Sequence, residues 1–166
     1  MQNTRISLIV AIIIFMLPLS GISQDETKRE AVFLEGLGSG ILYSFNYDWR
    51  FKDQANGLGA KVGLGYTAID GYSVTTLPFA VNYLVGRKRN FLELGLGATV
   101  LFLSRTNSTF TSSDPRLTAS GLLFNGIIGY RRVAQSGFLL RAGLTPFFSS
   151  DPAQLLAPQV SIGYAF

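Results

Sequence analysis

The stretch ILYSFNYDWRF, residues 41–51, decides how the chain is interpreted. Its odd-numbered positions are all large and apolar or aromatic. Its even-numbered positions from 44 onward are polar: Ser44, Asn46, Asp48 and Arg50. Because successive side chains of a β-strand point to opposite faces, this segment predicts a strand with one apolar and one polar face. A helix would scatter the same residues around its surface.

The same period-two alternation recurs along the chain. Further segments that show it are 58–67, 77–83, 92–102, 122–131, 138–148 and 160–166. A weaker first strand at 31–38 brings the number of predicted strands to about eight, an even number that single-chain membrane barrels allow. A tilted membrane strand needs about 9–11 residues, which these segments approach. We therefore expect an all-β fold, an eight-stranded antiparallel transmembrane up-and-down β-barrel over residues 31–166.

The composition favours a protein whose outside contacts lipid. Charged residues make up 14% of the chain, aromatic residues 13%, and there are 18 glycines. Soluble domains carry about 25% charged residues. The chain has no Cys and no His, which excludes disulfides, thiolate nucleophiles and the commonest general base and transition-metal ligand. A net charge of +4 is too small and scattered to indicate nucleic acid, and we expect no cofactor and no metal site.

The first 23 residues have the features of a secretory signal peptide. Arg5 supplies the positive start, and an apolar run follows over 6–17. Small residues before the expected cut predict cleavage between Ser23 and Gln24. The alternative is an uncleaved membrane anchor, although the apolar run is shorter than the roughly 20 residues of a spanning helix. Residues 24–30 would then form a short periplasmic segment before the barrel.

The connections between the predicted strands alternate in length. With the amino terminus in the periplasm, the periplasmic turns are short and polar: 52–57, 86–90 and 132–137. The outer connections are 38–40, 70–74, 104–117 and 149–157; the last two are the longest in the chain, and the first is unusually tight. Short turns inside and long loops outside are typical of outer-membrane barrels. Aromatic residues at the periplasmic strand ends predict an interfacial girdle: Trp49, Phe51, Tyr83, Phe91, Tyr130, Phe138, Tyr164 and Phe166.

The last segment, VSIGYAF at 160–166, alternates up to a terminal Phe166, with Tyr164 two positions before it. This ending resembles the carboxyl-terminal assembly signal of bacterial outer-membrane barrels. In pattern, the whole mature chain resembles the small eight-stranded, single-domain members of that family. The resemblance implies a monomer in the outer membrane, with membrane lipid around it and the barrel-assembly machinery as a partner during biogenesis.

The polar face of the strands predicts what fills the barrel. An eight-stranded barrel has room inside only for side chains or one small ligand. Opposite charges in such an interior must pair, because desolvation is costly. We expect a structural lumen network, with Asn46, Asn82 and Asn125 between its charged members: Glu35, Asp48, Arg50, Lys61, Glu93, Arg131 and Arg141. A narrow polar path or a small-ligand pocket stays open as the alternative.

The expected function is non-enzymatic, structural or surface-interacting, through the outer loops 104–117 and 149–157. Loops on a rigid scaffold commonly carry binding. A narrow pore or small-ligand barrel and a membrane-embedded lipid-modifying enzyme remain alternatives. The absence of His argues against the enzyme, and we predict no catalytic residue. A soluble, lipocalin-like carrier would instead place the apolar side chains inside.

Overall fold

The computed structural model describes residues 28–69, 72–105, 116–148 and 156–166. The predicted signal peptide and its cleavage site between Ser23 and Gln24 lie outside these residues, as do the central parts of three outer connections. The described part contains these elements: β1 Glu30–Leu37, η1 Gly38–Gly40, β2 Tyr43–Arg50, β3 Gly57–Ile69, β4 Tyr72–Arg87, β5 Asn90–Arg105, β6 Arg116–Val133, β7 Phe138–Phe148 and β8 Leu156–Ala165.

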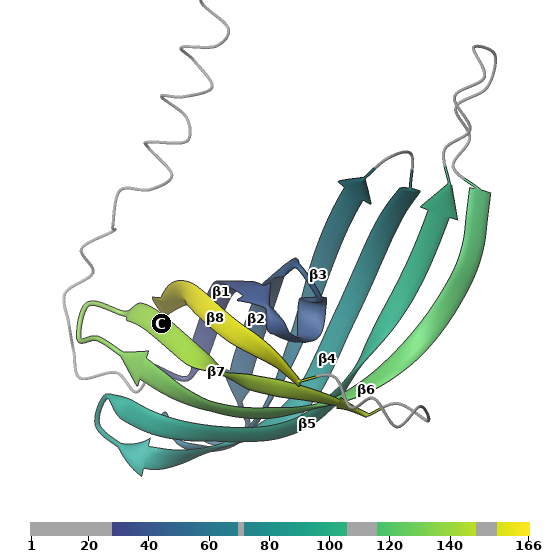
Figure 1. Cartoon of the computed structure of the whole chain (residues 1–166). Helices are drawn as coiled ribbons and strands as arrows, with labels where there is room; N and C mark the ends of the chain where they lie inside the picture. Colours follow the sequence, from purple (N-terminus) through teal and green to yellow (C-terminus); the bar gives the residue numbers. More distant parts are fainter. Residues whose placement is uncertain (1–27, 70–71, 106–115, 149–155) are drawn as a thin grey trace, which may run out of the picture.

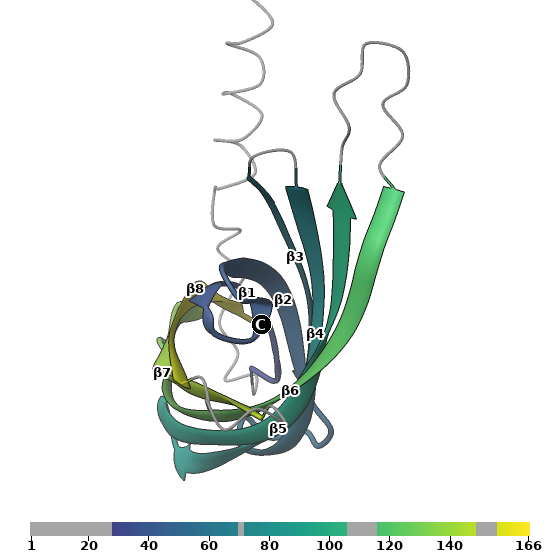
Figure 2. The ribbon, with the colours of Figure 1, turned by 45° about the vertical axis from the view of Figure 1, so that its right-hand side comes forward.

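Neighbouring strands pair in antiparallel fashion in chain order, and β8 pairs back to β1, so the sheet closes into a barrel (Figures 1 and 2). The predicted eight-stranded up-and-down barrel is therefore confirmed. We call the end that holds Glu30, Phe166 and the short turns the turn end, and the opposite end the loop end. Among the described residues, no helix is long and apolar enough to cross a membrane.

The two faces of the sheet are those that the alternation predicted. Outward side chains such as Leu96 and Phe124 are 69% and 57% exposed, whereas the inward Lys61 and Glu93 are each 1% exposed. Apolar outside and charged inside is the reverse of a soluble barrel, because the surrounding solvent is hydrocarbon rather than water. The lipocalin-like alternative requires the opposite arrangement and is wrong.

The outward apolar face has the height of a bilayer. On β5 it runs from Leu92 to Phe102, where register partners on β4 and β6 begin to include Thr75 and Ser120. That distance is about 33 Å along the strand at about 3.3 Å per residue. With the usual tilt of about 35–45°, the belt stands about 25 Å tall, as membrane barrels require.

Four strands continue beyond this belt at the loop end. The ladder between β2 and β3 ends on this side with the pair Phe45 and Leu64, and the ladder between β6 and β7 ends with Phe124 and Phe148. Beyond these pairs, β3 to β6 pair only with one another and form what we call the extended sheet: 66–69, 72–75, 102–105 and 116–123. Figures 1 and 2 show it standing clear of the closed ring.

The strand boundaries differ in places from those predicted. The first strand ends at Leu37 rather than Gly38, because η1 begins there and folds the first outer connection into the barrel. The connection predicted at 86–90 shrinks to Lys88 and Arg89 because both strands continue to the hairpin. The strands on either side of 70–71 are likewise longer than predicted.

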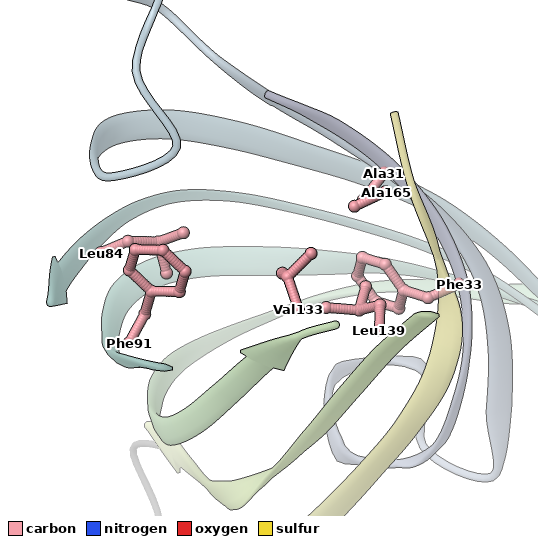
Figure 3. Close-up of a cluster of buried hydrophobic side chains, with 7 residues drawn as sticks. All are labelled: Ala31, Phe33, Leu84, Phe91, Val133, Leu139 and Ala165. Atoms are coloured by element: carbon pink, nitrogen blue, oxygen red, sulfur yellow. The ribbon is translucent and has the colours of Figure 1, made fainter. Parts of the chain in front are cut away.

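The lumen at the turn end is apolar, which the sequence did not predict. Figure 3 shows the cluster that fills it: Ala31, Phe33, Leu84, Phe91, Val133, Leu139 and Ala165. Phe91 is 3% exposed and faces inward, so its predicted place in the outer girdle is wrong. The reason is parity, since Phe91 shares the inward face of β5 with Glu93.

Candidate functional site: the lumen network and the η1 plug

All the charged residues predicted for the lumen are buried inside the barrel. They come from six different strands, so the network links the wall together from within. Two centres organise it, one around Asp48 and one around the pair of Glu93 and Arg141. Asn82 joins the centres, because its Nδ2 donates to Asp48 Oδ2 at 2.9 Å and to Glu93 Oε1 at 2.8 Å.

Asp48 on β2 accepts from two guanidinium groups. Arg131 Nη1 donates to Oδ1 at 2.8 Å, and Arg50 Nη2 donates to Oδ2 at 2.7 Å. Arg50 lies two residues along the same strand, whereas Arg131 comes from β6 on the far wall. The carboxylate therefore links opposite sides of the barrel, and its charge is compensated twice.

Arg141 on β7 contacts two carboxylates. Its Nε and Nη2 donate to the two oxygens of Glu93 at 2.9 and 2.8 Å, a bidentate arrangement that fixes geometry as well as charge. Its Nη1 donates to Glu35 Oε2 at 3.1 Å. The guanidinium also lies over the ring of Phe33, 4.3 Å from its centroid, so the polar network rests on the apolar cluster.

The short helix η1 closes the network toward the loop end. Ser39 is 1% exposed, and its N–H and Oγ both donate to Glu35 Oε1, at 3.1 and 2.7 Å. Lys61 Nζ donates to Ser39 Oγ at 2.9 Å and to Glu35 Oε2 at 3.0 Å. Thr99 Oγ1 donates to the Ser39 carbonyl at 2.7 Å, and Thr76 Oγ1 to the Gly40 carbonyl at 3.3 Å. We call residues 38–40, held in this way, the η1 plug.

The plug and its hydroxyl partners are the part of the site that sequence reasoning missed. Ser39, Thr76 and Thr99 lie outside the predicted network because hydroxyl residues carry no distinct signal, whether in a connection, as Ser39 is, or in a strand. Of the predicted asparagines, Asn82 is central, and Asn125 reaches Thr99 through a 3.2 Å hydrogen bond. Asn46 donates only to the neighbouring Ser44.

The arrangement fixes the buried charged side chains in place by pairing them. Four cations face three carboxylates in the described lumen, and each carboxylate has at least two cationic or amide donors. A carboxylate saturated in this way is a weak base and offers no open metal position. No group of three metal-ligating side chains occurs in the part of the chain that the structure describes. The geometry therefore favours mechanical cohesion over chemistry.

The predicted assembly residues lie where the barrel closes. On β8, Tyr164 pairs with Val32 of β1 and Phe138 of β7, and its ring faces outward, 42% exposed. Phe166 N donates to the Glu30 carbonyl at 2.9 Å, and its own carbonyl accepts from Glu30 N at 3.1 Å. Gly163 permits this closure, because a Cβ there would lie 2.1 Å from the Val32 carbonyl oxygen.

Comparison with known proteins agrees with this architecture. No protein-family model matches the chain, and no curated protein matches it in sequence. Among solved structures, the amino-terminal β-barrel domain of Pseudomonas aeruginosa OprF superposes with a TM-score of 0.58 at 13% identity, covering 84% of this chain and 98% of that one. Ail, the attachment invasion locus protein of Yersinia pestis, gives a TM-score of 0.50 at 14% identity, covering 84% and 100%. The chain therefore has the fold of the small eight-stranded outer-membrane barrels that its sequence resembles.

Proposed function

We propose that this protein is an integral, non-enzymatic outer-membrane barrel that recognises a partner outside the cell through its loop end. The observation that carries the proposal is the extended sheet, which continues past the apolar belt as paired β-structure. Strands longer than the bilayer requires present a rigid surface beyond the membrane. Ail, a protein named for attachment and invasion, has the same fold, which makes such a role compatible with the architecture.

The polar residues on the outward face of the extended sheet support a water-facing role, and its opposite face carries Tyr72 and Leu103, which are 48% and 38% exposed. Beyond the belt, the outward face includes Ser73, Thr75, Ser104 and Ser120, whereas the same face within the belt is apolar. Among the described residues, the strands that border it, β3 and β6, have no ladder partner on their outer edges there. Exposed strand edges offer backbone N–H and C=O groups to a partner chain, and loops at their ends add side-chain contacts.

The lumen supports the non-enzymatic part of the proposal. Its carboxylates are buried and bound by cations, and the η1 plug lies between them and the loop end. A substrate at the loop end would have no path to them without moving the plug. We therefore assign the network a structural role and the binding role to the outer surface.

The test uses the full mature chain in nanodiscs, labelled and applied to an array of extracellular-matrix proteins and polysaccharides. In one variant, residues 106–115 are replaced by a Gly/Ser linker of equal length. In a second, Ala68→Lys and Ser120→Lys place charges on the exposed edge strands. We expect at least one ligand that the parent retains and either variant loses. Both variants must keep the heat-dependent mobility shift of a folded barrel.

The control is a variant with Lys52→Gln at the turn end, which should bind as the parent does. The proposal fails if the parent binds nothing on the array, or if both loop-end variants bind as strongly as the parent. The first result would leave the barrel with a purely structural role.

A further inference from the structure

The outer rim of the turn end carries a concentrated positive charge. Arg87 ends β4 and Arg132 lies near the end of β6, and both are register partners of Asn90 on β5. Both face outward and are exposed, as are Lys88 and Arg89 in the hairpin between β4 and β5. Two strand spacings of about 4.8 Å place the arginines about 10 Å apart on one face. We call these four residues the basic row.

The charge of the basic row is not neutralised within the described protein. None of its four cations lies within 4.0 Å of a described carboxylate oxygen. The two described acidic residues outside the lumen are engaged elsewhere: Glu30 accepts from the Tyr47 hydroxyl, and Asp53 pairs with Arg29. Arg89 Nη2 donates to the neutral Gln135 Oε1 at 2.8 Å, which leaves its charge uncompensated. Guanidinium groups without a carboxylate partner at a membrane surface attract phosphate, which they can bind in a bidentate manner.

Apolar rows adjoin the basic row on the same outward face. The first consists of Val85, Leu92 and Tyr130, each 46–50% exposed and two positions further from the turn end. The Tyr130 hydroxyl donates to Asn90 Oδ1 at 2.6 Å, which links this row to the residue that lies between the two arginines in the register. A headgroup binding the arginines would thus have its glycerol and acyl chains against apolar side chains.

A groove continues this path toward the middle of the belt. It has a volume of about 460 Å³ and is lined by residues that include Tyr83, Leu94, Gly126, Pro146 and Phe148. Gly126 keeps it open, because a Cβ there would meet Pro146 Cγ at 2.9 Å. From Arg132 to Gly126 the strand covers about 20 Å at about 3.3 Å per residue, which is about the length of a membrane acyl chain.

We propose that the basic row and this groove form a binding site for one anionic glycerophospholipid of the leaflet around the turn end. The phosphate lies between Arg87 and Arg132, and one acyl chain follows the outward face of β6 into the groove. The site goes beyond surface recognition and depends only on the barrel being embedded in a membrane. By the expected orientation, this leaflet is the periplasmic one.

Native mass spectrometry of the detergent-solubilised full mature chain tests the site. The protein is mixed with equal amounts of dioleoyl phosphatidylglycerol and dioleoyl phosphatidylcholine, which differ only in the headgroup. We expect one retained phosphatidylglycerol, favoured about tenfold over phosphatidylcholine, because each basic residue near the surface contributes measurably to anionic lipid binding. Arg87→Gln with Arg132→Gln should abolish the preference, and Arg87→Lys with Arg132→Lys should retain most of it.

The matched control removes two charges from the same rim away from the site, with Lys28→Gln and Lys52→Gln. It should keep the preference. Equal retention of the two lipids by the parent overturns the proposal, as does equal loss of preference in both double Gln variants. Each variant is first checked for a heat-dependent mobility shift. A parent chain without that shift would contradict the membrane barrel itself. Failure of the barrel fold is thereby distinguished from failure of the lipid site.

Discussion

At the scale of single residues, Arg141 joins the parts of the lumen network. It binds both oxygens of Glu93 and one oxygen of Glu35, and its guanidinium covers Phe33. Glu35 in turn holds the η1 plug through Ser39. Losing Arg141 would leave two carboxylates under-compensated in a dry interior, which is costly.

We therefore predict that Arg141→Met lowers the free energy of unfolding by about 3–5 kcal/mol. The measurement is urea unfolding of the barrel in lipid vesicles. A double-mutant cycle with Glu93→Gln should give a coupling free energy of about 1–3 kcal/mol, because the second change removes one uncompensated buried charge. Lys52→Met, at an exposed position outside the network and the basic row, should change stability by no more than about 0.5 kcal/mol. Additive effects of the Arg141 and Glu93 changes would contradict a shared network.

The individual lumen residues also show which features of the site the sequence could predict and which it could not. That Asp48, Lys61 and Glu93 face inward follows from strand parity alone. Which cation meets which carboxylate does not, because the pairing depends on how far each strand is shifted around the barrel. Phe91 illustrates the limit, since its strand-end position suggested the girdle while its parity places it in the apolar cluster.

At the scale of elements, the strands were predictable because one face of each contacts lipid and the other the lumen. The η1 plug was not, because GLGSG at 36–40 has no periodicity and its inward fold depends on distant partners. Those partners are Lys61 and Thr99, 22 and 60 residues away from Ser39 along the chain. The extended sheet was also missed, since strand length beyond the belt leaves no distinct pattern.

We predict that the plug keeps Ser39 inaccessible in the folded barrel. The chain has no native Cys, so a Ser39→Cys variant gives a single thiol whose reaction with a water-soluble maleimide reports on exposure. Ser136→Cys, the same chemical change at an exposed turn, is the matched control. The Ser39→Cys thiol should react at least about tenfold more slowly, because reaction requires local opening of the plug. In urea the two thiols should react at equal rates, which checks their intrinsic reactivity. If the Ser39→Cys and Ser136→Cys thiols also reacted at similar rates in the folded barrel, residues 38–40 would not occupy the lumen.

At the scale of the whole molecule, the barrel is asymmetric along its axis. The turn end has short turns, the apolar cluster in its lumen and a basic outer rim. The loop end has the η1 plug and the extended sheet. Between them the outward face is apolar over about 25 Å, the height expected for membrane barrels. Lipid, rather than a protein core, therefore supplies the apolar environment for most of the large hydrophobic side chains.

This dependence on lipid predicts that the cost of an outward charge varies with depth. Leu96 lies near the middle of the belt on β5 and is 69% exposed, and Leu156 lies at the loop end of β8 and is 57% exposed. Leu96→Arg should lower the free energy of unfolding in vesicles by about 2–4 kcal/mol, and Leu156→Arg by only about 0–1 kcal/mol, because the bilayer centre is the driest region. Urea titration of each variant measures both values. Equal costs at the two positions would mean that the belt does not face hydrocarbon, and the membrane placement of every outward residue would fall with it.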